Sequence, residues 1–253
     1  MNTATRPKIA LEQAAQSVAR VVKRLADFDW DRILDNIDQS GYAVLESLLT
    51  PQECGLLAAL YDEDLAFRSK IVMARHGFGR GQYKYFAYPL PGVVADLRRA
   101  LYPRLYGLAN RWNERMGVAV RYPEKHEAFL DRCHRAGQVR PTPLLLQYRE
   151  GDFNCLHQDL YGEHVFPLQT AILLSRPQQD FTGGEFILSE QRPRMQSRVT
   201  VVPLEQGSGV IFAVNNRPVQ GQRGSYRVKL RHGVSPVRSG LRHTLGIIFH
   251  DSG

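Results

Sequence analysis

The sequence has few of the residues that mark several specialised classes of protein. Its three cysteines, Cys54, Cys133 and Cys155, are far apart, which excludes a disulfide framework and favours a reducing, cytoplasmic location. No apolar run approaches the length that spans a bilayer, and the first residues contain no signal-peptide core, so we predict no membrane segment. There is also no internal repeat, and no Gly-Lys-Ser/Thr pattern of a phosphate-binding loop.

Lysine is scarce too, although the chain is basic. The formal net charge is +8, and only six of the 33 basic residues are lysine, which leaves 27 arginines. The guanidinium group suits phosphates and carboxylates because it binds them with two parallel hydrogen bonds. The arginines are scattered along the sequence rather than clustered. The charge therefore leaves two interpretations open, an anionic partner such as nucleic acid or an ordinary arginine-rich surface.

The first 141 residues are mostly of helical character. Apolar residues recur at helical spacing, and capping and turn residues punctuate them. The predicted helices cover 9–26, 30–37, 51–65, 91–116 and 124–135. A short strand is expected over 41–46, and two β segments over 69–88 are joined by the glycine-rich run 76–81. We interpret that run as a hairpin turn, and a mobile substrate lid is the alternative.

After Thr142 the sequence becomes rich in short β-type runs separated by turn residues. These runs cover 144–149, 155–159, 169–175, 184–189, 197–202, 209–213, 226–234 and 241–250. About eight short strands at this spacing are typical of a jelly roll, also called a double-stranded β-helix. We therefore predict a mainly β protein of the α+β class. Residues 1–141 form a helical N-terminal layer on the catalytic core 142–253, and the whole is a single folded unit.

The motif His157-Gln158-Asp159 lies at the centre of the β-rich half. Alternate residues of a strand share a face, so His157 and Asp159 point the same way and offer two ligands of a 2-His-1-carboxylate iron site. The third ligand must come from a distant strand. The candidates are His164, His232, His243 and His250, of which His164 follows His157 too closely.

The sequence around His232 distinguishes it from the other candidates. Arg242 follows ten residues later, and Arg242 and Thr244 share one face of the last predicted strand while His243 takes the other. An arginine beside a hydroxyl inside a β-barrel suits a dicarboxylate, since a buried unpaired guanidinium is otherwise destabilising.

These residues resemble the motifs of the Fe(II)/2-oxoglutarate-dependent dioxygenases, in particular the prolyl-hydroxylase-like branch. The resemblance covers roughly residues 142–250. The matching positions are Tyr148, Gly151, His157, Asp159, His232, Pro236, Val237, Gly240 and Arg242. It implies that His157, Asp159 and His232 bind Fe(II). It also implies that Arg242 binds the far carboxylate of 2-oxoglutarate with help from Thr244, and that Tyr148 hydrogen-bonds this co-substrate.

The implied reaction uses O2 and 2-oxoglutarate to hydroxylate a C–H bond and releases succinate and CO2. One hypothesis for the substrate is damaged nucleic acid, with oxidative dealkylation as the outcome. However, AlkB-type dealkylases carry a second arginine six residues after the co-substrate arginine, where this chain has Ile248. The alternatives are hydroxylation of a protein side chain, an amino acid or another small molecule, and a non-catalytic jelly-roll binding module.

Overall fold

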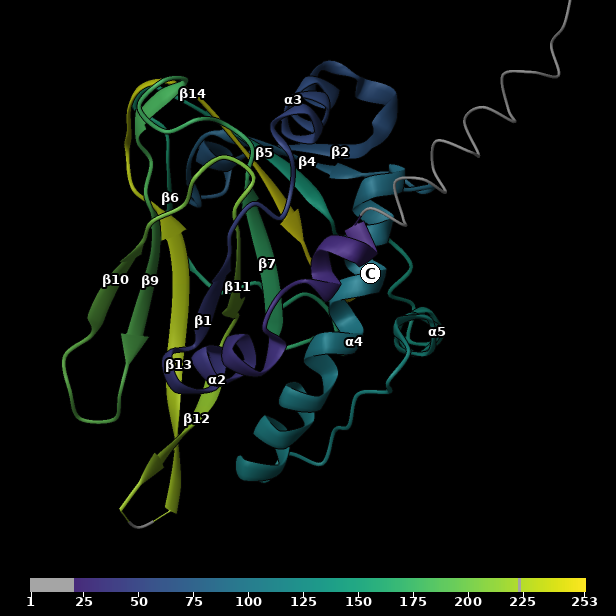
Figure 1. Ribbon diagram of the computed structural model, residues 1–253, viewed down its shortest axis with the longest axis vertical. Coiled ribbons are helices and arrows are strands. Elements are labelled where there is room, and N and C mark those ends of the chain that lie inside the picture. Colours follow the sequence, from purple (N-terminus) through teal and green to yellow (C-terminus); the bar gives the residue numbers. More distant parts are fainter. Residues whose placement is uncertain (1–20, 223) are drawn as a thin grey trace, which may run out of the picture.

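The computed structural model describes residues 21–222 and 224–253, which form helices on one side of two antiparallel sheets (Figure 1). The helices are α2 (Trp30–Ser40), α3 (Pro51–Ala59), α4 (Gly92–Arg115) and α5 (His126–Arg135). Residues 21–26 are helical, while 9–20 of the predicted first helix lie outside the described residues. None of the helices described is long and apolar enough to cross a membrane.

Local sequence accounts for where the helices begin and end. Gly41 ends α2 in the left-handed conformation at φ 83°, which glycine adopts without steric penalty. Thr50 and Glu53 form a reciprocal capping box at the start of α3. The prediction of one helix over 51–65 was wrong, because α3 stops at Ala59 and two 3-10 turns follow, Leu60–Asp62 and Asp64–Ala66.

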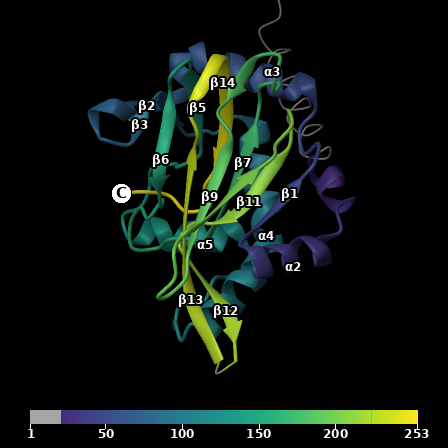
Figure 2. The same ribbon diagram turned by 90° about the vertical axis from the view of Figure 1, so that its left-hand side faces the viewer.

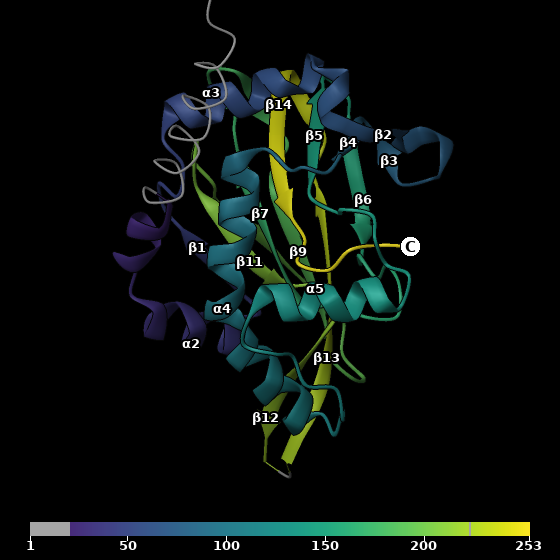
Figure 3. The same ribbon diagram turned by 90° about the vertical axis from the view of Figure 1, so that its right-hand side faces the viewer.

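The larger sheet has eight strands, and elements from both halves of the chain build it. Seven strands lie in the order β1-β11-β7-β14-β5-β4-β2, and β8 pairs with β14. The strands are β1 (Tyr42–Leu45), β2 (Phe67–Val72), β4 (Gln82–Phe86), β5 (Leu144–Arg149), β7 (Leu168–Leu173), β8 (Phe181–Gly183), β11 (Gly209–Ala213) and β14 (Val237–Ile247). Helices α4 and α5 cover its outer face (Figure 3).

The smaller sheet has six strands in the order β10-β9-β13-β6-β3, with β12 paired to β13. The strands are β3 (Gly79–Arg80), β6 (Phe153–His157), β9 (Phe186–Gln191), β10 (Arg198–Val202), β12 (Asn216–Gly221) and β13 (Gly224–Val234). No helix of the described residues lies on its outer face (Figure 2). The two sheets form the predicted jelly roll, and the prediction of an α+β protein with a double-stranded β-helix is confirmed.

The apolar core of the described residues has three clusters, one of which contains Tyr83, Tyr148 and Phe181. The largest cluster lies between the eight-stranded sheet and the helices and includes Trp112, Tyr102 and Phe249, which are fully buried. A smaller cluster between the sheets includes Phe186 and Phe212. The largest cluster anchors the sheet, while the cluster with Phe186 and Phe212 surrounds the site described below.

The glycine-rich run 76–81 is the tip of a hairpin, as predicted, because β2 and β4 pair antiparallel on either side of it. The tip also crosses to the other sheet, where β3 pairs with β6 through Gly79 and Arg80. A Cβ at Gly79 would lie 2.4 Å from the Phe153 carbonyl oxygen, so only glycine fits there. This segment therefore bridges the two sheets beside the strand that ends in His157.

Candidate active site

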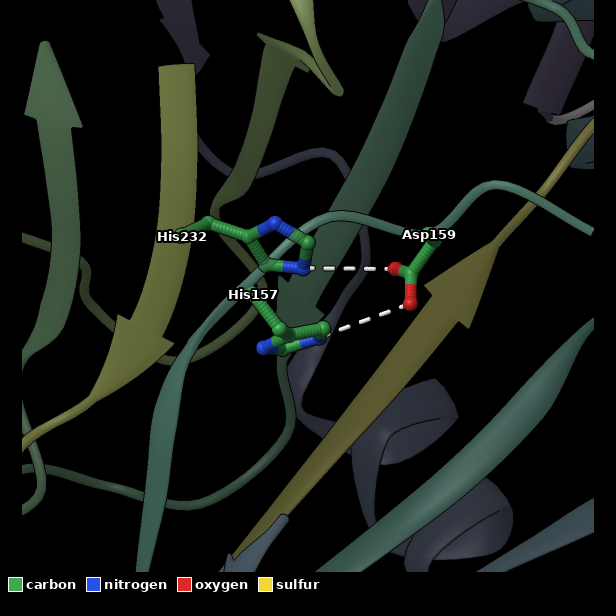
Figure 4. A group of neighbouring side chains, drawn as sticks. All are labelled: His157, Asp159 and His232. Atoms are coloured by element: carbon green, nitrogen blue, oxygen red, sulfur yellow. Dashed lines mark ion pairs between the residues drawn. The ribbon is translucent and has the colours of Figure 1, made fainter. Parts of the chain in front are cut away.

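Three predicted ligands meet between the sheets. His157 ends β6, and its Cα pairs with that of His232 on the neighbouring strand β13. Asp159 follows two residues later. Its carboxylate lies 3.4 Å from His157 Nε2 and 3.3 Å from His232 Nε2, as Figure 4 shows. Among the residues that the structure describes, these three form the group able to hold a metal ion, with ligand atoms within 4.8 Å of one another.

The two histidines are oriented by different means. The Nδ1 of His157 is 2.8 Å from the Cys155 carbonyl oxygen. This carbonyl fixes the proton on Nδ1 and leaves the Nε2 lone pair for a metal. His232 Nδ1 is buried and has no hydrogen-bond partner in the described part of the chain. Its ring is held by packing against Phe186 and Phe212, with ring centroids 6.1 and 4.6 Å away.

The electrostatics of the group favour an anionic carboxylate beside a neutral imidazole. Burial alone would raise the pKa of Asp159, but the imidazoles of His157 and His232 beside its carboxylate hold this pKa well below its usual range. Burial by itself would lower the pKa of His157, but the Asp159 carboxylate outweighs burial and raises it. Burial and the nearby His157 lower the pKa of His232. A deprotonated carboxylate and a neutral imidazole are the forms that bind a divalent metal.

A tyrosine that sequence reasoning missed supports the carboxylate. The Tyr161 hydroxyl donates a 2.7 Å hydrogen bond to Asp159 Oδ1. Burial and the Asp159 charge raise the pKa of this phenol, so it remains a donor. Tyr161 follows Asp159 by two residues, and this spacing could have indicated from the sequence that the two side chains lie close together. Beyond it, Tyr83 and Tyr85 of β4 meet edge to face at 5.3 Å, and their alternation with Lys84 was visible in the sequence.

Arg242 lies in the same cavity, on the central strand β14. It is 1% exposed, and its Nη1 donates a 2.5 Å hydrogen bond to Thr244 Oγ1. Its Nε has no partner, and no carboxylate of the described residues lies within ion-pair distance of the guanidinium. Burial lowers the pKa of Arg242 to about 10, so the group is still charged at neutral pH.

The cavity between these groups has a volume of about 200 Å³, and Tyr148 forms part of its wall. The Tyr148 side chain is fully buried and accepts a long, 3.4 Å hydrogen bond from Asn154 Nδ2. Gly184 leaves room for the arginine, because a Cβ there would lie 2.9 Å from Arg242 Cδ. The sequence-predicted set is thus brought together on one cavity. It comprises His157, Asp159, His232, Arg242, Tyr148 and Thr244.

The other candidate ligands lie elsewhere. His243 points to the opposite side of β14 and contacts Gln147 and the ring of Tyr61. His250 is buried and accepts a hydrogen bond from the Phe166 amide. The backbone of His164 is tied to Gln138, and no described metal group includes this histidine.

The residues present fit Fe(II) and 2-oxoglutarate. Two imidazole nitrogens and one carboxylate on one side leave coordination positions facing the cavity, which suits non-haem iron. The guanidinium of Arg242 lines the same cavity and supplies a charge that a bound carboxylate would neutralise. An intact ligand set facing an unpaired buried cation argues against a non-catalytic binding module.

Comparisons with known proteins agree with this site. A family model described as "Oxygenase, catalysing oxidative methylation of damaged DNA" matches residues 81–252. The uncharacterized protein Rv2227 of Mycobacterium tuberculosis is 50% identical over 167 residues, which cover 66% of this chain and 72% of that protein.

Solved structures share the fold at low sequence identity. An oxidoreductase of the 2OG-Fe(II) oxygenase family from Burkholderia pseudomallei superimposes with a TM-score of 0.52 at 15% identity, covering 90% of this chain and 94% of the other. A prolyl-4-hydroxylase from Pseudomonas putida gives 0.51 at 16% identity, with 88% and 99% covered. The family match, the fold and the ligand set together show that the chain belongs to the 2OG-Fe(II) oxygenase family, whose members use Fe(II) and 2-oxoglutarate.

Proposed function

We propose that this oxygenase removes alkyl groups from damaged bases of nucleic acid by oxidising them. The observation that carries the proposal is the family match, which spans residues 81–252 and whose description names damaged DNA. The family description speaks of oxidative methylation. An oxygenase inserts oxygen into a C–H bond, and oxidation of a methyl group in this way leads to its removal rather than its addition. The net charge of +8 fits a polyanionic partner.

Co-substrate binding would fall to Arg242, Thr244 and Tyr148, which line the same cavity as the metal ligands. Arg242 would hold the far carboxylate of 2-oxoglutarate, and Thr244 fixes the guanidinium by accepting from Nη1. Tyr148 keeps its proton because burial raises the pKa of its phenol, so its hydroxyl is a donor for the co-substrate. The triad and Arg242 together set the direction in which 2-oxoglutarate lies.

Iron bound by His157, Asp159 and His232 would supply O2-dependent oxidation of a C–H bond, coupled to conversion of 2-oxoglutarate to succinate and CO2. One oxygen atom enters succinate and the other enters the substrate. An N-methyl group becomes N-hydroxymethyl, which then breaks its C–N bond to release formaldehyde and restore the N–H. The protein binds and orients both substrates, and Tyr161 holds the ligand carboxylate in place.

The walls of the cavity suit a flat, aromatic substrate. Phe78 of the hairpin tip and Tyr83 and Tyr85 of β4 line the cavity together with the triad. Enzymes that modify a base take it out of the stack and hold it between aromatic side chains. Phe78 is 47% exposed, so a ring at the rim is available to contact an entering base.

A second candidate is hydroxylation of a protein side chain or an amino acid. It is favoured by the spacing of Tyr148, Gly151, His157 and Asp159, which follows the prolyl-hydroxylase-like pattern. Both candidates use the same iron and co-substrate, so they differ only in what enters the cavity beside Phe78.

The test measures succinate formation by the iron-loaded enzyme with three additions. These are an oligonucleotide carrying N-methylated bases, the same oligonucleotide without methyl groups, and a proline-containing peptide. Of the three additions, we expect only the methylated oligonucleotide to give succinate together with an equal amount of formaldehyde. Stimulation by the peptide, with hydroxylated peptide as product, would transfer the assignment to the second candidate. His157→Ala serves as the inactive control.

A further inference from the structure

We infer that the outer face of the six-stranded sheet is a docking groove for the sugar-phosphate backbone of nucleic acid. The inference rests on the proposed function and deepens it, because it names the surface that would hold the substrate strand. It starts from the arginines that are scattered along the sequence. The fold brings Arg227 and Arg231 of β13 beside Arg192 and Arg194 of the β9–β10 connection. They belong to the sheet whose outer face is covered by no helix of the described residues (Figures 1 and 2).

The alternation of β13 creates two faces with different chemistry. His232, Leu230 and Val228 point inward and are buried, while Arg231, Lys229 and Arg227 are exposed on the outside. Residues two apart on a strand are separated by roughly 6.6 Å. The outer face thus carries a row of three evenly spaced cations on the same strand that supplies the third metal ligand. Arg227, at one end of the row, donates a hydrogen bond to the Met116 carbonyl oxygen after α4.

Two adjoining hollows follow this row. Their walls consist of basic, amide and hydroxyl side chains with one proline, and they share Lys229 and Gln191. No aspartate or glutamate lines either hollow. The complete lining is Ser189, Gln191, Arg192, Pro193, Arg194, Ser197, Asn216, Arg227, Lys229 and Arg231. We call this surface the β13 groove.

Most of the cations of the groove are not neutralised. Among the residues that the structure describes, Arg194, Lys229 and Arg231 take part in no ion pair. Glu190, which precedes Gln191 of the groove, is 7% exposed, and its carboxylate is already held by Arg217 at 2.7 Å and Arg192 at 2.9 Å. The groove therefore presents excess positive charge to solvent.

This chemistry matches a phosphate backbone more closely than other anions. Protein contacts to the nucleic-acid backbone come from arginine and lysine together with serine, asparagine and glutamine, which are the residue types that line the β13 groove. A row of cations along a strand also suits a repeating linear charge. Because the groove and the metal site lie on opposite faces of β13, the base that enters the cavity would come from a neighbouring part of the bound strand.

The test is equilibrium binding of a fluorescent 20-nucleotide oligonucleotide to the full chain, measured by anisotropy at several salt concentrations. The test variant is Arg194→Gln/Lys229→Gln/Arg231→Gln. The matched control, Arg111→Gln/Lys125→Gln/Arg135→Gln, removes the same charge from exposed positions on the α4–α5 side. Binding of 2-oxoglutarate by both variants verifies that the fold and the cavity are intact.

We expect the groove variant to bind roughly tenfold or more weakly, with the salt slope of log K reduced by about 2, since three backbone contacts are lost. The control variant should bind like the wild type. Equal losses in both variants would overturn the inference, because net charge alone would then explain binding. Wild-type binding to phosphatidylglycerol vesicles that is as tight as binding to the oligonucleotide would also overturn it.

The outcome is independent of the proposed reaction, because anisotropy requires no turnover. Oligonucleotide binding that depends on the groove, without oxidation of any methylated base, would support the groove and contradict the proposed function. If the groove variant oxidised a methylated oligonucleotide with an unchanged KM, the proposed function would be supported and the groove would be contradicted.

Discussion

Two buried arginines of this protein have opposite surroundings. Arg98 and Arg242 are 2% and 1% exposed, but Arg98 binds Asp251 at 2.6 Å, the Tyr88 hydroxyl at 3.0 Å and the Ile248 carbonyl at 2.8 Å. Arg242 has the Thr244 hydroxyl and no carboxylate partner among the described residues. A protein keeps an unpaired buried charge only where something else compensates for it. The contrast separates an arginine that stabilises the fold from one that awaits a ligand.

The largest effect on stability is expected when the ion pair between Arg98 and Asp251 is broken. Arg98→Met leaves the buried Asp251 with His134 and the Tyr88 hydroxyl but without its arginine. We expect the free energy of unfolding to fall by about 3 kcal/mol. Urea titration followed by circular dichroism measures the change. Arg99→Met is the control, because Arg99 is 58% exposed in its ion pairs, and such pairs contribute about 0–1 kcal/mol.

Equal losses in the Arg98 and Arg99 variants would contradict the comparison. The same titration tests whether residues 1–141 and 142–253 form one folding unit, which remains a proposal. Arg98 lies in the first segment and Asp251 in the second, so we expect one transition. Two separated transitions would show two units.

The opposite result is expected at Arg242. Because Arg242→Met removes a buried charge that has no carboxylate partner among the described residues, the protein without ligands should be as stable as the wild type or more stable by on the order of 1–3 kcal/mol. The same urea titration, carried out without metal or 2-oxoglutarate, measures it. A loss comparable with that of Arg98→Met would mean that Arg242 is structural.

A smaller effect concerns two buried histidines outside the active site. Burial lowers the pKa of His126 to about 3 and that of His250 to about 4. Below pH 6.5 the unfolded chain therefore takes up protons that the folded chain does not, so stability falls as the pH falls. Each histidine contributes up to about 1.4 kcal/mol per pH unit.

His126→Asn isolates this contribution. Between pH 6.5 and pH 5, where most carboxylates remain ionised, its unfolding free energy should change less steeply than that of the wild type by about 1 kcal/mol per pH unit. Urea titrations at four pH values suffice. Parallel lines for the two proteins would show that His126 is not buried in its neutral form.

The smallest effect concerns how Thr244 positions Arg242 for binding 2-oxoglutarate. Thr244→Val removes the hydroxyl that accepts from Nη1 while preserving shape. We expect 2-oxoglutarate to bind about tenfold more weakly, since a hydrogen bond to a charged group contributes about 1.5 kcal/mol or more. Calorimetric titration measures it, with Thr200→Val on β10 as the control. Identical affinity in the two variants would leave Thr244 without a role in positioning.

Parts of this architecture follow directly from sequence periodicity. The ranges predicted for β5 and β11, 144–149 and 209–213, coincide with the observed strands. β6 begins two residues earlier than predicted and ends at His157, so Asp159 lies beyond the strand and still faces the cavity. Strands β8 and β12 were missed. β8 has only three residues, and β12 contains Pro218 and Gly221, which are usual in turns.

What could not be predicted depends on contacts between distant segments. The pairing of Gly79 with Asn154 places Phe78 at the cavity, and no local pattern in the hairpin indicates its partner. The same holds for the β13 groove. Arg194 and Arg231 are separated by more than thirty residues, so their shared surface appears only when β9 and β13 pair.

The most direct test of the contrast between the two arginines is calorimetric titration of 2-oxoglutarate into anaerobic, Mn(II)-loaded protein. The wild type, Arg242→Met and Arg99→Met are compared. We predict metal-dependent binding by the wild type and Arg99→Met, and a loss of about 2–5 kcal/mol in Arg242→Met, because the co-substrate carboxylate would lose its cation. Equal affinity for the wild type and Arg242→Met would show that this buried charge has another purpose, and the assignment of Arg242 would be wrong.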